Sequence, residues 1–204
     1  MDKQRSIKAI LFDFDGTIVD LRTDYDRIRC GLSKYFNNFG IKKEFKPMLK
    51  KIDESIEELK KKKKGGDADK IRKQAYQIID AEELKAADKA ELKKGAFELL
   101  HFLKKEKGKK KKVVIISRNG RNIINYLFNK FNLPKPDLIL SRDDVKEIKP
   151  SKDHIEKALV ELNLKRNECI IVGDTFHDIE AGLNNNINVI LVAEDIQKLK
   201  SIIA

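Results

Sequence analysis

The sequence predicts an α/β protein, in which a doubly wound, Rossmann-like parallel sheet carries an inserted all-α domain. Five short apolar runs, rich in β-branched residues, have the length and low charge of strands buried on both faces of a sheet. They span residues 7–14, 113–117, 137–141, 168–173 and 188–193. Helical patterns separate the last four runs, and this alternation is typical of a doubly wound sheet. The long interval between the first two runs has only helical periodicity, which predicts the insert.

The helices expected around the sheet follow from apolar residues at helical spacing. The clearest pattern places Ile123, Ile124 and Leu127 on one stripe. Another helix should begin after Pro150, with Ser151 as its N-cap residue. In all, we expect helices of this domain over residues 94–106, 119–131, 151–162, 176–184 and 195–203.

The insert is expected to consist of three helices, over residues 24–39, 47–63 and 68–87. Gly40 marks a break after the first of them, and the lysine run at residues 60–64 is expected in a solvated loop. We therefore expect residues 1–19 and 93–204 to form one α/β core, and residues 20–92 to form a helical domain of their own.

The overall composition excludes several classes of protein. Of 204 residues, 41% are hydrophobic, which is enough to bury a core and argues against wholesale disorder. No run of about 18 apolar residues exists, so no membrane-spanning helix is expected. The first residues lack the apolar segment of a signal peptide, and two cysteines are too few for a disulfide framework or a zinc site. We therefore expect a cytoplasmic protein with no membrane partner.

Charge is the one feature of the composition that would fit a nucleic-acid partner. The 44 lysine and arginine residues exceed the 33 acidic residues, and the formal net charge is +11. Residues 20–94 hold more than half of this excess, with 21 basic against 15 acidic residues. The strand ends are instead rich in aspartate. The lysine runs are therefore interpreted as solvated faces, and no nucleic-acid partner is expected.

Polar and charged residues gather where the predicted strands end. Ligands of open α/β sheets bind at the carboxyl ends of the strands. Alternation along the first strand places Asp13 and Asp15 on the same side, and Gly16 permits a sharp turn after them. The residues expected to meet at this edge are Asp13, Asp15, Ser117, Arg118, Lys149, Asp174 and Asp178.

This set of side chains suits phosphoryl transfer. Clustered carboxylates repel one another, and a hard divalent cation such as Mg²⁺ relieves the repulsion through oxygen ligation. A hydroxyl and an ammonium group beside the metal fit a tetrahedral dianion. One carboxylate can accept the phosphoryl group covalently, while another, two residues away, protonates the leaving oxygen and later deprotonates water.

The same residues carry a resemblance to a known family, the haloacid dehalogenase superfamily. The segments that resemble its four ordered motifs are residues 13–17 (DFDGT), Ser117, Lys149 and residues 173–178 (GDTFHD). By this resemblance, Asp13 is the nucleophile and Asp15 is the general acid and base, while Ser117 and Lys149 hold the transferring phosphoryl group. The groups implied to hold Mg²⁺ are Asp13, the backbone carbonyl of Asp15, Asp174 and, in support, Asp178.

Asp15 narrows the resemblance to phosphatases and phosphomutases, because the dehalogenases of the superfamily lack an acid at this position. The helical insert resembles the α-helical cap of phosphoglycolate-phosphatase-like members. Arg118 departs from the residues common after the second-motif hydroxyl, and it either contacts the phosphate or is exposed. Thr17 either caps the turn after Gly16 or contacts the phosphate.

The expected function is therefore Mg²⁺-dependent hydrolysis of a small phosphomonoester, such as phosphoglycolate or a sugar phosphate, through an aspartyl-phosphate at Asp13. One alternative is a phosphomutase of the same superfamily. Another is a nucleic-acid-associated phosphatase or binding module that uses the basic surface on polynucleotide ends. The expected partner is a small phosphorylated metabolite, and the chain is expected to be a monomer or a homodimer.

Histidines and cysteines are assigned structural roles. His154 is expected to be exposed, and His177 to be a surface residue at the start of a helix. Cys30 and Cys169 are both expected to pack in apolar surroundings.

Overall fold

The computed structural model describes residues 7–62, 67–105, 111–192 and 196–199. The chain divides into two compact units. The core unit is formed by Met1–Leu21 and Ala90–Ala204, and the insert unit by Arg22–Lys89. Within the described ranges, no helix is both long enough and apolar enough to span a membrane.

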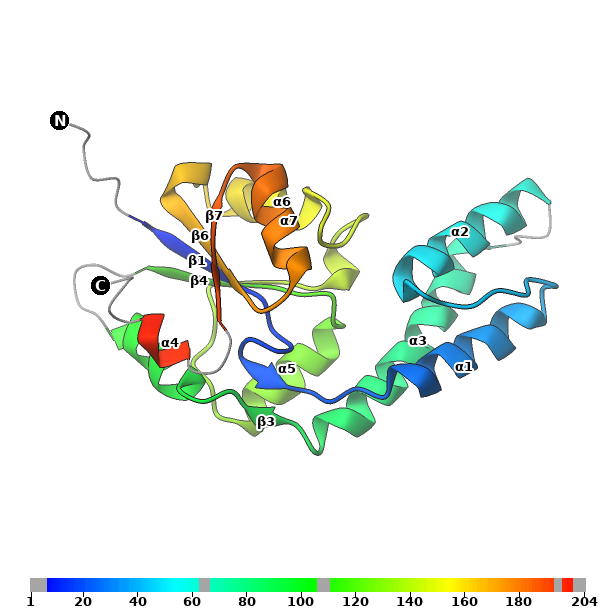
Figure 1. The fold of residues 1–204 in the computed structure, drawn as a ribbon, viewed down its shortest axis with the longest axis horizontal. Helices are drawn as coiled ribbons and strands as arrows, with labels where there is room; N and C mark the ends of the chain where they lie inside the picture. Colours follow the sequence, from blue (N-terminus) through cyan, green and yellow to red (C-terminus); the bar gives the residue numbers. More distant parts are fainter. Residues whose placement is uncertain (1–6, 63–66, 106–110, 193–195, 200–204) are drawn as a thin grey trace. The chain divides into compact units, whose positions relative to one another are not determined.

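The core unit is built on a five-stranded parallel sheet (Figure 1). Its strands are β1 (Ala9–Phe12), β4 (Lys112–Ile116), β5 (Leu138–Leu140), β6 (Cys169–Gly173) and β7 (Asn188–Leu191). Their order is β5-β4-β1-β6-β7, so β1 lies at the centre and pairs with both β4 and β6. Each strand predicted from an apolar run is confirmed.

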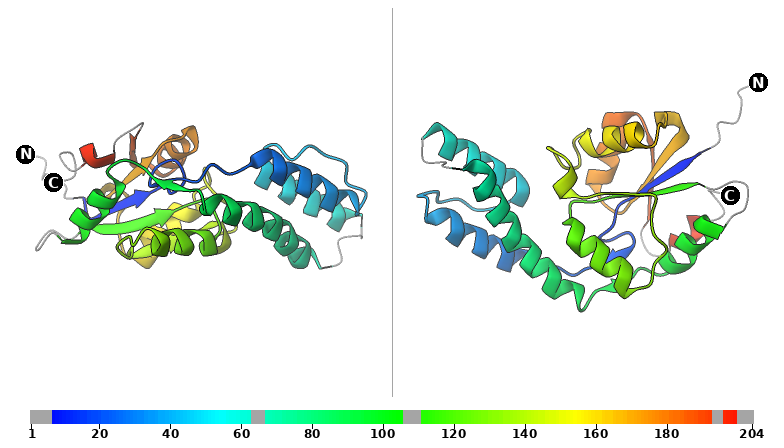
Figure 2. Two further views of the ribbon diagram at one scale, coloured as in Figure 1. Left: turned by 90° about the horizontal axis from the view of Figure 1, so that it is seen from below. Right: turned by 180° about the vertical axis from the view of Figure 1, so that it is seen from behind.

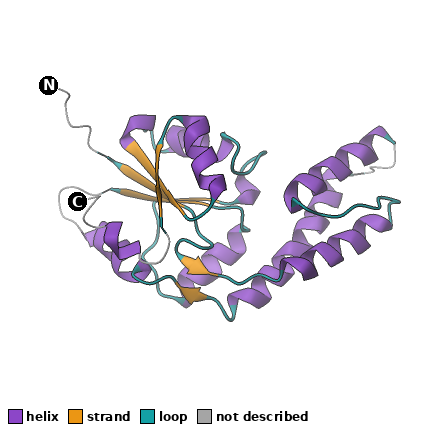
Figure 3. Ribbon diagram, in the orientation of Figure 1, coloured by secondary structure: helices purple, strands orange, loops and turns teal. Residues whose placement is uncertain are grey.

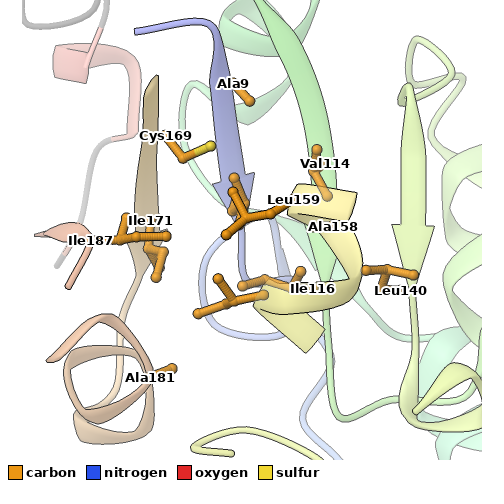
Figure 4. Packing of buried hydrophobic residues seen from close by; sticks show 12 residues of the cluster. Ala9, Val114, Ile116, Leu140, Ala158, Leu159, Cys169, Ile171, Ala181 and Ile187 are labelled. Carbon is orange, nitrogen blue, oxygen red and sulfur yellow. The ribbon is translucent and has the colours of Figure 1, made fainter. Parts of the chain in front are cut away.

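Helices cover both faces of this sheet, as a doubly wound fold requires (Figures 1 and 2). Figure 4 shows Ala158 and Leu159 of one helix packed over the strands, where they join a cluster that includes Leu11 and Ile171. On the opposite face, Phe14 stacks on Phe128, with 5.7 Å between ring centroids. The helices are α6 (Asp153–Glu161) and α7 (Phe176–Asn185) on the first face, and α4 (Ala96–Lys105) and α5 (Arg121–Lys130) on the second. The predicted fold class is confirmed.

The cap of one helix and the type of another differ from the sequence prediction. Helix α6 begins at Asp153 with Lys152 as its N-cap residue, so the prediction of Ser151 as the cap is wrong. Ser151 instead belongs to a turn, in which its N–H donates to the carbonyl of Ile148. The helix expected over residues 195–203 is a 3₁₀ turn at Ile196–Leu199, and its other residues lie outside the described ranges.

A short antiparallel pair, β2 (Val19–Asp20) with β3 (Glu91–Leu92), was not predicted. Val19 pairs with Leu92, and Asp20 with Glu91. Strands of two residues are too short to show a period of alternation, which is why the sequence pattern missed them. Both strands belong to the core unit, which therefore extends to Leu21 and resumes at Ala90.

The insert unit is all helical in the described residues, apart from its loops (Figure 3). Asp24 and Asp67 cap the first and third helices by accepting hydrogen bonds from backbone N–H groups of the first turn. The helices are α1 (Tyr25–Asn37), α2 (Met48–Lys61) and α3 (Ala68–Ala87). They enclose an apolar cluster of their own that includes Ile28, Leu32, Phe36, Ile52, Ile56, Leu59, Ala75 and Ile79.

Two local predictions for the insert are wrong. Cys30 is exposed, because the buried stripe of α1 runs through Ile28 and Leu32 and leaves Cys30 on another face of the helix. The lysine run predicted as a loop begins inside α2, which continues to Lys61. Residues 63 and 64 of that run lie outside the described ranges. Cys169, by contrast, is buried at the start of β6, as predicted.

Candidate active site

Three carboxylates and one ammonium group meet at the carboxyl edge of the sheet. The Nζ of Lys149 lies 2.7 Å from Oδ1 of Asp13 and 2.7 Å from Oδ1 of Asp178. Asp13, Asp174 and Asp178 each offer one carboxylate oxygen, and these oxygens all lie within 4.8 Å of one another. Four of the predicted site residues are thus brought together, although they come from three separate regions of the sequence.

The first segment of the site follows directly from β1. The N–H of Asp13 donates to the carbonyl of Val172 at 2.8 Å, which extends the pairing with β6 by one residue. Gly16 then turns the chain with φ +92°. A Cβ at this position would lie 2.1 Å from Oδ2 of Asp174, so only glycine allows the turn to approach that carboxylate.

Thr17 has a role that neither sequence interpretation foresaw. It is fully buried, and its hydroxyl donates to Oδ1 of Asp174 at 3.1 Å. Asp174 itself is exposed, and it lies between the end of β6 and the start of α7. The hydroxyl of Thr17 therefore orients a carboxylate of the site that burial does not hold in place.

Asp178 is held by the first turn of α7. Its Oδ2 accepts hydrogen bonds from the Thr175 hydroxyl at 2.8 Å and from the Thr175 N–H at 3.1 Å, and the second of these bonds belongs to the capping box at the start of α7. Its Oδ1 remains for Lys149. One carboxylate thus caps the helix and faces the ammonium group at the same time.

The protonation of the two buried carboxyls is perturbed in opposite directions. Burial raises the pKa of Asp13 above its ordinary value, and the charge of Lys149 offsets this effect only in part. For Asp178, burial also acts to raise the pKa, but Lys149 and the two hydrogen bonds from Thr175 outweigh it and lower the pKa. A divalent cation beside Asp13 would favour its ionised form.

Ser117 and its neighbours form the corresponding loop after β4. Ser117 is fully buried, and its hydroxyl donates to Oδ1 of Asn119 at 2.9 Å and accepts from the N–H of Asn119 at 3.1 Å. Since β4 pairs with β1, this loop leaves the sheet at the same edge as Asp13. Asn119 was not singled out from the sequence, although its place two residues after Ser117 was visible.

Arg118 and Asp15 lie outside the group of carboxylates around Lys149. The side chain of Arg118 is exposed. Partial burial of His177 lowers the pKa of that histidine, and the charge of Arg118 lowers it further. The carboxylate of Asp15 accepts a hydrogen bond from the N–H of Leu21 at 2.9 Å. The structure therefore places Asp15 in the turn that follows the site, with its side chain bound to the backbone.

His154 corrects a further prediction. It was expected to be exposed, but it is fully buried between Lys149 and the end of β5. The apolar stripe of α6 alone did not show this, because the partners of the imidazole lie on other parts of the chain.

The donor set fits a hard divalent cation. Oxygen ligands from carboxylates are those that Mg²⁺ prefers, and Asp13, Asp174 and Asp178 offer three of them in one small volume. Two of the three side chains are buried next to a single ammonium group, which leaves negative charge for a cation to balance.

Comparison with known proteins identifies the family. The model of the haloacid dehalogenase-like hydrolases matches residues 10–192. A phosphoglycolate phosphatase from Aquifex aeolicus is 30% identical over 179 residues, which are 86% of this chain and 80% of that protein. The pyrophosphatase PpaX from Bacillus thuringiensis strain Al Hakam is 26% identical over 189 residues, 87% of this chain and 79% of that protein.

Solved structures share the fold. The crystal structure of CbbY from Rhodobacter sphaeroides in complex with phosphate matches with a TM-score of 0.62 and 21% identity, over 91% of this chain and 85% of that one. The chain therefore belongs to the haloacid dehalogenase-like hydrolase family and is one of its phosphatases.

Proposed function

We propose that the protein is a Mg²⁺-dependent phosphatase that hydrolyses a small phosphomonoester through an aspartyl-phosphate at Asp13. The observation that carries the proposal is the group around Lys149, whose Nζ lies 2.7 Å from both Asp13 and Asp178, beside Asp174. A buried cation next to a carboxylate nucleophile offers charge where the oxygens of a phosphoryl group must be held.

In the first half of the proposed reaction, an Oδ atom of Asp13 attacks phosphorus and the bond from phosphorus to the leaving oxygen breaks. The protonated carboxyl of Asp15 gives its proton to that oxygen, so the alcohol leaves uncharged. Lys149 and the hydroxyl of Ser117 bind the phosphoryl oxygens, and Asp13 carries the phosphoryl group as an acyl phosphate.

In the second half, Asp15 accepts a proton from water as the water oxygen attacks phosphorus. The bond between phosphorus and Asp13 breaks, inorganic phosphate leaves, and Asp15 is again protonated. Because the N–H of Leu21 donates to Oδ1 of Asp15, the proton transfers of both steps are assigned to Oδ2.

Mg²⁺, when bound, would neutralise charge on the phosphoryl oxygens as the bonds change. Asp13, Asp174 and Asp178, together with the backbone carbonyl of Asp15, are the groups proposed to hold it. Thr17, through its hydrogen bond to Asp174, keeps the most exposed of these ligands oriented.

The proposed substrate is a small phosphorylated metabolite, with phosphoglycolate or a sugar phosphate as the first choice. The 30% identity to a phosphoglycolate phosphatase over most of both chains supports this choice, and Arg22–Lys89 is proposed to serve as the cap that selects the substrate. The proposed setting is the cytoplasm, with the protein as a monomer or homodimer. Phosphoglycolate, hexose phosphates and pyrophosphate should be compared at equal Mg²⁺ concentration, because two of the relatives differ in the substrate that they are named for.

The nucleophile assignment is tested by Asp13→Asn, which keeps the shape of the side chain and removes its nucleophilic oxygen. Release of phosphate from para-nitrophenyl phosphate in Mg²⁺ should fall by at least about a thousandfold. Asp26→Asn is the matched control, because Asp26 is exposed on α1 and pairs only with Arg29 among the contacts described. Full activity in the Asp13 variant, with the control unchanged, would refute the proposal.

A further inference from the structure

His154 connects the backbone of Lys149 to the end of strand β5. It is the second residue of α6 and is fully buried. Its Nδ1 lies 3.2 Å from the N–H nitrogen of Lys149, and its Nε2 lies 3.1 Å from the carbonyl oxygen of Ser141. The imidazole therefore joins two points of the connection between β5 and α6 that are eight residues apart in sequence.

These two partners determine which nitrogen of the ring carries hydrogen. A backbone N–H can only donate, so Nδ1 has to accept and is unprotonated. A carbonyl oxygen can only accept, so Nε2 has to carry the hydrogen and donate. The contacts fit the neutral Nε2–H tautomer alone, and burial together with the charge of Lys149 lowers the pKa of His154 to about 4.

The Ser141 end of this link is itself firmly held. Ser141 and Asp144 form a capping box around the 3₁₀ turn at Arg142–Asp144. The Nζ of Lys157, from α6, donates to the carbonyl of Asp144 in this turn at 2.7 Å. The imidazole thus fastens Lys149 to a turn that is anchored both to β5 and to α6.

The reach of Lys149 makes this anchoring relevant to the site. Its side chain spans from the backbone that His154 holds to Asp13 and Asp178, with both Nζ distances at 2.7 Å. The side chain is almost fully buried. A shift of the Lys149 backbone would therefore also shift Nζ, because the tightly packed surroundings prevent the side chain from adopting another rotamer that compensates for it.

We propose that His154 is a positioning residue for Lys149, and that it acts as a neutral imidazole which accepts the hydrogen bond of the Lys149 N–H. Its effect on turnover rests on the proposed function. The contact itself, and the tautomer that it requires, do not depend on that function.

Two conservative variants separate the two hydrogen bonds of the ring. In His154→Asn, the amide oxygen takes the place of Nδ1 and can still accept from Lys149, but the side chain is too short for Ser141. In His154→Gln, the longer amide can still donate to Ser141 and loses the bond to Lys149. His154→Phe keeps the ring and removes both bonds.

The proposal predicts that kcat/KM for para-nitrophenyl phosphate in saturating Mg²⁺ falls by about 10- to 100-fold in His154→Phe, since an error of about 1 Å at a reacting group has effects of this size. If His154→Phe lowers kcat/KM a hundredfold, kcat/KM of His154→Asn should be at least tenfold higher than that of the phenylalanine variant. For His154→Gln, kcat/KM should be as low as for the phenylalanine variant. In a Lys149→Ala background, His154→Phe should cause no further loss, because the two residues act as one.

Other outcomes would overturn the proposal. If Asn and Gln lose activity equally, or if losses follow only the free energy of unfolding, the role of His154 is structural. If the phenylalanine variant does not fold, the comparison of Asn with Gln still decides the matter.

Nitrogen NMR of the wild-type imidazole gives a readout that needs no substrate. At neutral pH the spectrum should show a protonated Nε2 and an unprotonated Nδ1, and a protonated Nδ1 would refute the contact. If the wild-type protein releases no phosphate from any phosphomonoester, the proposed function fails while this spectrum still tests the link to Lys149.

Discussion

Gly16→Ala would test whether the turn after β1 holds Asp174, a proposed metal ligand, in place. Two costs follow from the structure. Alanine at φ +92° is strained by about 1–2 kcal/mol. Its Cβ would also lie 2.1 Å from Oδ2 of Asp174, where ordinary contact begins near 3.4 Å, so that the carboxylate must withdraw by about 1 Å.

Gly40→Ala separates the two costs. Gly40 also has a positive φ, +75°, but among the described residues no atom beyond its own chain neighbours lies within 4 Å of the Cβ position. Urea unfolding should show that both variants lose about 1–2 kcal/mol of the free energy of unfolding, with a larger loss for Gly16→Ala. Only the Gly16 variant should also lose kcat/KM by about 100-fold and need more Mg²⁺ for half-maximal rate, because a displacement of about 1 Å affects the reacting groups.

The assay is phosphate release from para-nitrophenyl phosphate over a series of Mg²⁺ concentrations. If Gly16→Ala folds and keeps both the wild-type Mg²⁺ dependence and the wild-type kcat/KM, then Asp174 does not hold the metal. An equal kinetic loss in Gly40→Ala would instead show that backbone strain, and not the contact with Asp174, accounts for the effect.

Three further predictions concern stability and reactivity. His154 has a pKa of about 4 in the folded protein and an ordinary value of 6.5, because burial and the charge of Lys149 oppose protonation more than Asp144 and Asp153 favour it. As pH falls from 6.5 to 4, the unfolded chain therefore takes up the proton first, and urea unfolding should show that the wild type loses about 3 kcal/mol more of its free energy of unfolding than His154→Gln. Parallel pH profiles of the two proteins would contradict this. Gly182→Ala would place a Cβ 2.1 Å from a methyl group of β7, and the free energy of unfolding should fall by about 1–3 kcal/mol; an unchanged midpoint of thermal unfolding would rule out a tight contact there. A thiol reagent at pH 8 should modify Cys30, which is exposed on α1, quickly, and Cys169 only after denaturation, because burial raises the pKa of the Cys169 thiol to about 11. Rapid modification of both cysteines would contradict the burial of Cys169.

The sheet could be predicted from the sequence because its strands are continuous apolar runs. β6, for example, has only apolar residues before Gly173, and such a run is recognised without any knowledge of its neighbours. The carboxylates after β1 and β6 could likewise be placed at one edge, since parallel strands bring their carboxyl ends together. In both cases the residues that indicate the structure lie within the strand or directly after it.

The features that could not be predicted depend on side-chain contacts made by loops, whose paths the periodicity of the sequence does not show. His154 is buried because Ser141 and Lys149 offer it an acceptor and a donor, and nothing within α6 indicates either partner. The hydroxyl of Thr17 was assigned to a turn or to phosphate, while its partner, Asp174, lies 157 residues away. Asp15 belongs to the first motif recognised in the sequence, but its carboxylate accepts a hydrogen bond from the N–H of Leu21. This contact depends on the path of the chain after the turn, which the motif does not determine.

The pairing of β2 with β3 has a consequence for how this chain can be altered. Val19 and Leu92 lie opposite each other in this antiparallel pair within the core unit, so the segment between them begins and ends at nearly the same point. Closing a loop there costs conformational entropy that grows only slowly with its length. A designer could therefore excise residues 22–89 at this position, graft a different domain or substitute a short hairpin turn, while the edge that carries Asp13, Asp174 and Asp178 keeps its own backbone path.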